Sequence, residues 1–188
     1  MDVDGLFQSL INDTGLPSIK ATWVEQFIKS PITFWCDLHA PPDLKDPLDP
    51  YVDHLFAEGD EHQLNVTAES YPGALEVRFF SEEEGFRRTL ELMAAGEKFI
   101  KNMPLMCRSV GLEGRPDVLV RVDDIGSGLG EYSYGVVEIK SARHVTVGYT
   151  LQGAVYNRLL GIVQGYEPEE FYIINRDSDH RAIPMAEV

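Results

Sequence analysis

Two short segments of the chain carry side chains suited to metal-dependent hydrolysis, GRPDVLV (114–120) and VVEIKSA (136–142). Asp117 stands where a Gly-Arg-Pro turn enters a valine-rich strand, and Glu138 and Lys140 lie two positions apart on a second such strand. Side chains two apart on a strand point to the same face, so Glu138 and Lys140 share one. Because Asp117 and Glu138 are 21 positions apart, two strands of about seven residues and a loop fit between them. If these strands form a hairpin, the two carboxylates can meet.

Two facing carboxylates bind a hard cation such as Mg²⁺ through oxygen. Such an ion lowers the pKa of a bound water and stabilises charge on a phosphate under attack, and a neighbouring lysine orients the water or stabilises the transition state. Burying Glu138 and Lys140 on a strand that also carries Val136, Val137 and Ile139 is costly without a function. The alternative is a salt-bridged pair at a sheet edge, because a carboxylate with a nearby Glu-X-Lys is a common pattern.

Gln152 and Tyr156 follow on TLQGAVYNRLLGIVQG (150–165), an amphipathic segment that predicts a helix ending at Gly165. Four positions apart on a helix, the two side chains share a face. The helix follows the Glu-X-Lys strand directly, so its first half is expected to pass near the metal. The amide and the phenol can bond a phosphate or a base, or position the lysine. Alternatively, they are a helix-interface residue and a core tyrosine.

The succession of GRPD, VVEIKSA and LQGAVY resembles the RecB-like branch of the PD-(D/E)XK nuclease superfamily, over roughly residues 98–175 and more loosely 55–97. The resemblance implies an α/β, restriction-endonuclease-like core of order αβββαβ, with a central mixed sheet flanked by helices. It implies that Asp117, Glu138 and the Ile139 carbonyl hold Mg²⁺ or Mn²⁺ and that Lys140 is the catalytic lysine. The expected reaction is in-line attack of a metal-activated water on phosphorus.

The resemblance also implies a histidine that completes the metal site, placed on an early helix shortly after a glycine. AEGDEHQL (57–64) offers Gly59 and His62, and imidazole suits Mn²⁺ as well as Mg²⁺. Glu58 and Glu61 are alternatives from the same helix, and an ordinary surface histidine is the other interpretation of His62. Family members with an iron–sulfur cluster need four cysteines, so none is expected here, where Cys36 and Cys107 are the two present.

The formal net charge of −15 counts against nucleic-acid binding, because a protein that grips a phosphate backbone usually shows a basic surface. Clustered carboxylates that a cation neutralises weaken this objection. Arg115 and Arg143 are expected to contact nucleic acid together with Gln152 and Tyr156, although Arg143 and Tyr149 can equally be plain loop residues. Basic residues concentrate in this stretch: Arg108, Arg115, Arg121, Lys140, Arg143 and Arg158. The charge predicts weak intrinsic affinity for DNA, or a protein partner that supplies it.

Hydrophobic periodicity indicates the elements that position these residues. Pro-rich residues 40–50 predict a loop, and the Ser81 and triple-Glu sequence predicts a helix N-terminus. The predicted helices cover 16–30, 51–70, 82–96 and 150–165, and the predicted strands cover 74–80, 98–108 with an interruption at Pro104, 114–124, 134–142 and 169–177. We expect an N-terminal helical extension with a Pro-rich linker over 1–50 and the nuclease domain over 51–188.

The composition, 44% hydrophobic and 25% charged, is that of an ordinary globular domain. The first residues are acidic where a secretory signal is basic, and apolar runs stay short of the ~18 residues of a membrane span. Both features predict a cytoplasmic protein without a membrane partner.

Three functions compete. The first is a Mg²⁺- or Mn²⁺-dependent nuclease that cuts single-stranded DNA or DNA with free ends, as an exonuclease or flap-type enzyme. The second is a catalytically weak module of the same fold that binds within a DNA-processing complex. The third is a different metal hydrolase that uses the same carboxylates.

Overall fold

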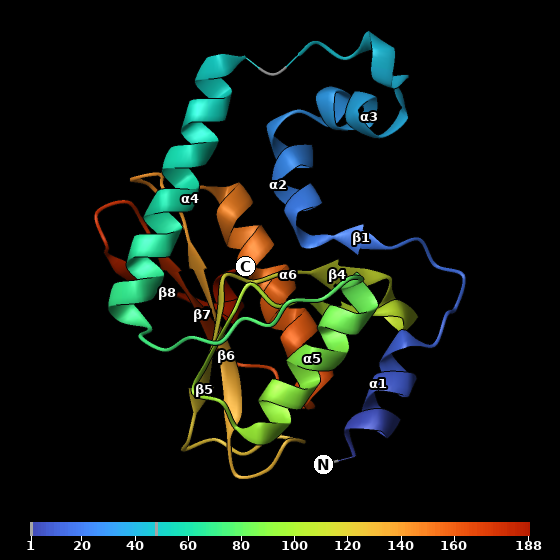
Figure 1. Cartoon of the computed structure of the whole chain (residues 1–188), viewed down its shortest axis with the longest axis vertical. Helices are drawn as coiled ribbons and strands as arrows, with labels where there is room; N and C mark the ends of the chain where they lie inside the picture. The colour runs from blue at the N-terminus through green and yellow to red at the C-terminus, as the bar shows by residue number, and fades with distance from the viewer. Residues whose placement is uncertain (1, 48) are drawn as a thin grey trace.

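Two mixed β-sheets flanked by helices form the body of the protein in the computed structural model, which describes residues 2–47 and 49–188 (Figure 1). The larger sheet has the order β2-β5-β6-β7-β8 and the smaller one β1-β4-β3. The strands are β1 (Ile19–Lys20), β2 (Phe99–Lys101), β3 (Leu105–Cys107), β4 (Leu112–Gly114), β5 (Val118–Val122), β6 (Ser133–Ile139), β7 (Glu170–Ile174) and β8 (His180–Pro184).

Side-chain caps fix where several helices begin and end. Ser81 accepts the N–H of Glu84 at the start of α5, and Gly96 ends that helix in the left-handed conformation. Thr146 caps the start of α6, and Gly165 ends it in the same way as Gly96. The helices are α1 (Val3–Ile11), α2 (Ala21–Lys29), α3 (Pro31–His39), α4 (Pro50–Ser70), α5 (Glu82–Ala95) and α6 (Val147–Gln164), with 3₁₀ turns at Pro42–Leu44, Arg108–Val110 and Met185–Glu187.

Both faces of the larger sheet are covered. Along β6, Val136 belongs to the main core beneath α5 and α6, whereas Val137 and Ile139 belong to a second cluster that includes Val66 of α4. This alternation follows from the two-residue period of a strand. A strand buried on both faces in this way holds any polar side chain on it, here Glu138, inside the protein.

The predicted hairpin is present. β5 and β6 pair antiparallel, and Val118 is opposite Val137, so the residue before β5 lies beside the end of β6. β6 then continues into α6 and returns as β7, which is parallel to β6. This register brings Asp117 to Glu138.

The prediction of a strand at 74–80 is wrong. The segment makes a single bridge to β2, at Leu75, and then leaves the sheet. Its alternation has another cause: Val77 and Phe79 pack against the main core, with Phe79 beside Gly85 of α5, while Phe80 is fully exposed. An extended segment that packs every second side chain against the core has the same period as a strand.

Other departures concern boundaries. The segment predicted as one interrupted strand at 98–108 is split between the two sheets, as β2 and β3, with Asn102 at φ 52° and Pro104 in the connection. The helices α1 and α3 and the edge strands β1 and β8 were not predicted, and β1 lies inside the segment predicted as a helix at 16–30, where the helix begins only at Ala21. The loop prediction for 40–50 fits a 3₁₀ turn and irregular backbone, apart from Leu48, which lies outside the described residues.

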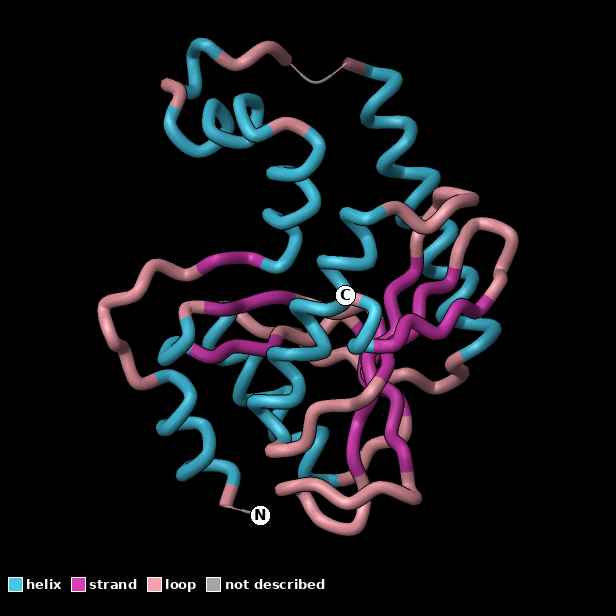
Figure 2. Tube along the Cα trace, turned by 180° about the vertical axis from the view of Figure 1, so that it is seen from behind, coloured by secondary structure: helices cyan, strands magenta, loops and turns pink. Residues whose placement is uncertain are grey.

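The N-terminal elements pack on the rest of the chain. Phe7 and Leu10 of α1 are buried in the main core, β1 pairs with β4, and α2 packs on α6. By contrast, α3 and the first half of α4 project beyond the sheets (Figures 1 and 2). Within the described residues, every helix is too short or too polar to cross a membrane. The domain boundary at residue 50 stays a prediction.

Candidate metal and nuclease site

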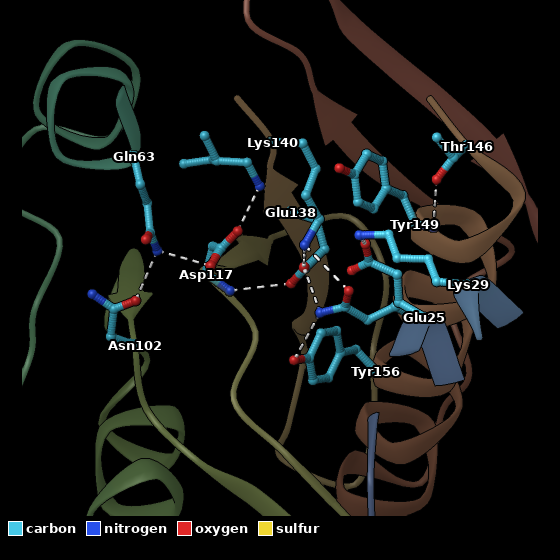
Figure 3. A network of polar contacts seen from close by, with 12 residues as sticks. Glu25, Lys29, Gln63, Asn102, Asp117, Glu138, Lys140, Thr146, Tyr149 and Tyr156 are labelled. Carbon is cyan, nitrogen blue, oxygen red and sulfur yellow. Dashed lines mark hydrogen bonds and ion pairs between the residues drawn. The ribbon is translucent and has the colours of Figure 1, made fainter. Parts of the chain in front are cut away.

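Asp117 and Glu138 meet at the end of the β5–β6 hairpin (Figure 3). The N–H of Asp117 donates to Oε1 of Glu138 at 3.2 Å, and the N–H of Ile139 donates to Oδ2 of Asp117 at 2.6 Å. Glu138 is only 1% exposed, while Asp117 is partly exposed. The two strands thus hold the two acids against each other through backbone hydrogen bonds, as the hairpin interpretation predicts.

Lys140 lies beside the acid pair on the same face as Glu138. Its Nζ is 2.9 Å from Oε2 of Glu138 and 3.3 Å from Oε1 of Gln152, and it lies 5.3 Å from the ring centre of Tyr149. Burial alone lowers the pKa of Lys140, but the negative charges of Glu138 and Asp117 outweigh it, so the pKa is raised. Lys140 therefore carries a positive charge next to the carboxylates.

Asp117 has a strongly raised pKa. Loss of water around its carboxyl and the negative charge of Glu138 raise its pKa to about 8, against the opposing effects of Lys140 and the Ile139 N–H. An acid in this state gains from any cation that approaches it. The raised pKa favours a functional role for this position, because strongly perturbed pKa values cluster at functional sites.

Gln152 and Tyr156 are buried under the acid pair. Nε2 of Gln152 donates to Oε2 of Glu138 at 3.4 Å and to the Tyr156 hydroxyl at 3.2 Å. Burial, followed by the charge of Glu138, raises the pKa of Tyr156, so the phenol stays neutral. Both side chains are buried, so neither is in a position to make the nucleic-acid contact that was predicted for it. Their contacts agree with positioning of Lys140, and the place of Tyr156 in the main core agrees equally with the alternative of a core tyrosine.

Gly114 has a steric role in the same region. A Cβ at this position would lie 2.4 Å from Cε1 of Tyr156, so the ring can occupy its place only beside a glycine. The GRPD segment therefore contributes an acid at one end and space for the tyrosine at the other.

Two contacts of Asp117 were missed in the sequence. Gln63 of α4 donates to Oδ1 of Asp117 at 2.8 Å and to Oδ1 of Asn102 at 3.0 Å (Figure 3). The N–H of Asn102 in turn donates to the Asp117 carbonyl at 3.1 Å. Gln63 is the direct neighbour of His62, the residue that was predicted to approach the acid pair from this helix.

His62 is directed elsewhere. It lines a separate cavity of about 510 Å³ with Glu58, Glu61, Ser141 and Arg176, among other residues. Its Nε2 is shielded from solvent and has no hydrogen-bond partner among the described residues. Over residues 2–47 and 49–188, no three His, Cys, Asp or Glu side chains gather as a metal site, so the structure brings Asp117 and Glu138 together without His62.

The acid pair retains capacity for a cation. A carboxylate offers about four lone-pair positions. Asp117 uses two of them, for Gln63 and the Ile139 N–H, and Glu138 uses three, for the Asp117 N–H, Lys140 and Gln152. Hard oxygen donors of this kind suit Mg²⁺ and Mn²⁺. The residues present therefore fit the expected metal, with Asp117 as the more available ligand.

The basic residues expected to contact DNA are engaged with acids. Arg115 pairs with Glu82 and lies over Phe79, and Arg143 pairs loosely with Asp177 while its side chain stays 71% exposed. The other four basic residues of this stretch also have acidic partners: Arg108 with Glu83, Arg121 with Asp123, Lys140 with Glu138 and Arg158 with Glu167. The local concentration of basic residues in the sequence therefore does not form a free positive surface.

A second group of side chains reaches the site from α2. Lys29 forms an ion pair with Glu25 and lies 6.0 Å from the ring centre of Tyr149, which is also near Lys140 (Figure 3). Tyr149 thus stands between two lysines, one from the N-terminal segment and one from the Glu-X-Lys strand.

Comparison with known proteins supplies no identity for this arrangement. No family model matches the chain, and no curated protein is significantly similar to it. The function must be inferred from the site itself.

Proposed function

We propose that the chain is a divalent-metal-dependent nuclease of the RecB-like PD-(D/E)XK type, which hydrolyses phosphodiester bonds of DNA. The observation that carries this proposal is the convergence of Asp117, Glu138 and Lys140 from two strands on one point. Burying a carboxylate and a lysine next to a second carboxylate of raised pKa lowers the free energy of unfolding, and a purely structural sheet gains nothing in return.

The topology supports the proposal. α5, the antiparallel strands β2, β5 and β6, the helix α6 and the parallel strand β7 follow one another in the αβββαβ order that the resemblance implies. The smaller sheet of β1, β3 and β4 is an addition to that order. We therefore assign the larger sheet and its two helices to a restriction-endonuclease-like core.

The residues that would hold the cation are Asp117, Glu138 and the Ile139 carbonyl. When bound, the cation activates water and neutralises charge on the scissile phosphate. Lys140, held by Glu138 and Gln152, keeps a positive charge where charge develops on the phosphate during attack. Gln152 and Tyr156 keep Glu138 and Lys140 in place, and Arg143, which is exposed but 4.0 Å from Asp177, would exchange that acid for a phosphate when a DNA strand binds.

A catalytically weak binding module in a DNA-processing complex is the second candidate. The net charge of −15 and the pairing of the basic residues near the site favour it. The three residues at the centre count against it, because a scaffold needs no ionised lysine beside two acids.

A cleavage assay separates the two candidates. Labelled single-stranded, duplex and flapped DNA would be incubated with the protein and either Mg²⁺ or Mn²⁺. Cleavage is expected, with a loss of about 10²-fold or more in Lys140→Ala. Lys98→Ala, an exposed lysine at the other end of the sheet, is the matched control and should cut like the wild type. Cleavage that is unchanged in Lys140→Ala, or absent from the wild type with both metals, contradicts the proposal.

A further inference from the structure

The N-terminal helix α2 brings a second lysine close to Lys140. Nζ of Lys140 lies 5.3 Å from the ring centre of Tyr149, and Nζ of Lys29 lies 6.0 Å from the same ring centre. The two ammonium groups are therefore at most about 11 Å apart, and Figure 3 shows Lys29 extending from α2 toward Tyr149. Since the two lysines are 111 positions apart in the chain, the fold brings them together, not the local sequence.

Close packing of two helices fixes Lys29 at this place. The helix α2 packs on α6, and Glu25 of α2 lies against Gly148, the residue before Tyr149. A Cβ on Gly148 would be 2.9 Å from Cγ and 3.5 Å from Cα of Glu25, so the helices approach as closely as a glycine allows. Tyr149 itself packs against the main core. The separation of the two lysines therefore depends on a helix contact and not on a loop.

Lys29 keeps donors that a ligand can use. Its ammonium group pairs with Glu25, four positions earlier on the same helix, and its side chain is 67% exposed. Within the described residues, this ion pair is the only one that Lys29 makes. Because an ammonium group has three N–H donors, Lys29 can hold Glu25 and an anion at the same time. An approaching anion then meets a neutralised acid and not a free carboxylate.

We infer that Lys29 binds a phosphate of the nucleic-acid strand whose scissile phosphate lies at Lys140, with the Tyr149 ring holding both ammonium groups by cation–π contacts. The inference rests on the proposed nuclease function and gives the direction of the substrate strand, from the acid pair across Tyr149 to the C-terminal end of α2. At ~3.4 Å per nucleotide along a strand, the two phosphates are at most about three nucleotides apart. The N-terminal segment then belongs to the substrate-binding surface.

Binding of fluorescein-labelled dT12 to the full chain in EDTA, followed by fluorescence anisotropy, tests the contact without cleavage. The wild type should bind with a Kd on the order of 100 μM at about 0.05 M NaCl, because the net charge of −15 opposes association. Lys29→Ala should raise the Kd about 3- to 10-fold and reduce the slope of log Kd against log salt concentration by about 0.7, the value for one phosphate contact on a single strand. Lys98→Ala removes the same charge at an exposed position at the other end of the sheet and should change neither quantity.

Conservative variants separate a phosphate contact from a structural role. Lys29→Arg keeps the positive charge and should restore most of the affinity that Lys29→Ala loses. Tyr149→Leu should weaken binding, because neither ammonium group then has a ring to hold it, and Tyr149→Phe should restore the affinity. Circular dichroism checks that each variant keeps its helices.

Kinetics with Mn²⁺ distinguish the failure of this inference from the failure of the nuclease proposal. Lys29→Ala should raise the KM for dT12 about 3- to 10-fold at nearly unchanged kcat, whereas Lys140→Ala should lower kcat. A wild type that binds dT12 without cutting it, while Lys29→Ala still weakens binding, overturns the nuclease proposal and retains the strand contact. Equal Kd and KM in Lys29→Ala and Lys98→Ala, or no binding of dT12 by the wild type, overturns the strand contact.

Discussion

The substitution Asp117→Asn tests whether the site stores unfavourable charge. The side chain of aspartate has a pKa near 3.8 in the absence of the fold, and burial together with Glu138 raises it to about 8 in the folded chain. Between these two values the folded protein keeps a proton that the unfolded chain has released, so the free energy of unfolding falls as the pH rises. The asparagine variant has no such proton to lose, and its advantage over the wild type should grow with pH up to about 8.

The size of the effect follows from the same two values. A change in pKa from 3.8 to about 8 corresponds to an upper limit of roughly 6 kcal/mol. Since Asp117 is partly exposed and the Gln63 amide can turn to accept from the new side chain, we expect about 1 to 3 kcal/mol at pH 8. For a chain of 188 residues this is a rise in Tm of about 3 to 10 °C.

Thermal unfolding followed by circular dichroism measures this difference at about pH 5, 7 and 9 in the presence of EDTA. In separate samples without EDTA, Mn²⁺ should raise the Tm of the wild type more than that of Asp117→Asn, because the cation takes the place of the proton. The exposed Asp123→Asn, at the opposite end of β5, serves as the control and should follow the wild type. An Asp117→Asn variant that is less stable than the wild type at pH 8, or a difference in stability that does not depend on pH, would contradict a raised pKa of Asp117.

Two further predictions concern the groups around the acid pair. Gly114→Ala should reduce stability by about 1 to 3 kcal/mol in urea unfolding, because its Cβ would overlap the Tyr156 ring, whereas Gly135→Ala, with open space around its Cβ, should leave stability nearly unchanged. Equal behaviour of the two variants would show that the tyrosine is not tightly packed there. Gln152→Leu should lower the cleavage rate by about 10- to 100-fold, because Glu138 and Lys140 lose a common partner. A Gln152→Leu enzyme that cuts at the wild-type rate would place the amide outside the working site.

The site's two central strands could be predicted because local sequence determines them. The Gly-Arg-Pro turn before Asp117 and the two-residue period of 134–142 depend only on neighbouring residues, and the spacing between the acids limited the connection to a hairpin. Gln63 could not be identified in this way. Its contact with Asp117 depends on how α4 is rotated about its own axis on the sheet. A rotation by the angle between successive helical residues would bring His62 to Asp117 in place of Gln63.

The misplaced strand at 74–80 has a similar origin. Val77 and Phe79 alternate with exposed residues, but a period of two does not specify whether the neighbouring element is a strand or a helix. The helix α3 was missed because its hydrophobic residues show no clear helical periodicity. It packs only by one side on α2, so the hydrophobic residues on its other sides are not arranged to face a core. Sequence periodicity reports burial, and it fails where burial is one-sided or absent.

Isothermal titration of Mn²⁺ into the protein at about pH 8 tests most directly whether Asp117 and Glu138 form a cation site. We expect a saturable binding heat for the wild type and for Asp123→Ala, and its loss in Asp117→Ala. Circular dichroism would verify that each variant is folded. Binding that is the same in Asp117→Ala as in the wild type, or no binding by the wild type, would contradict a cation site at Asp117 and Glu138.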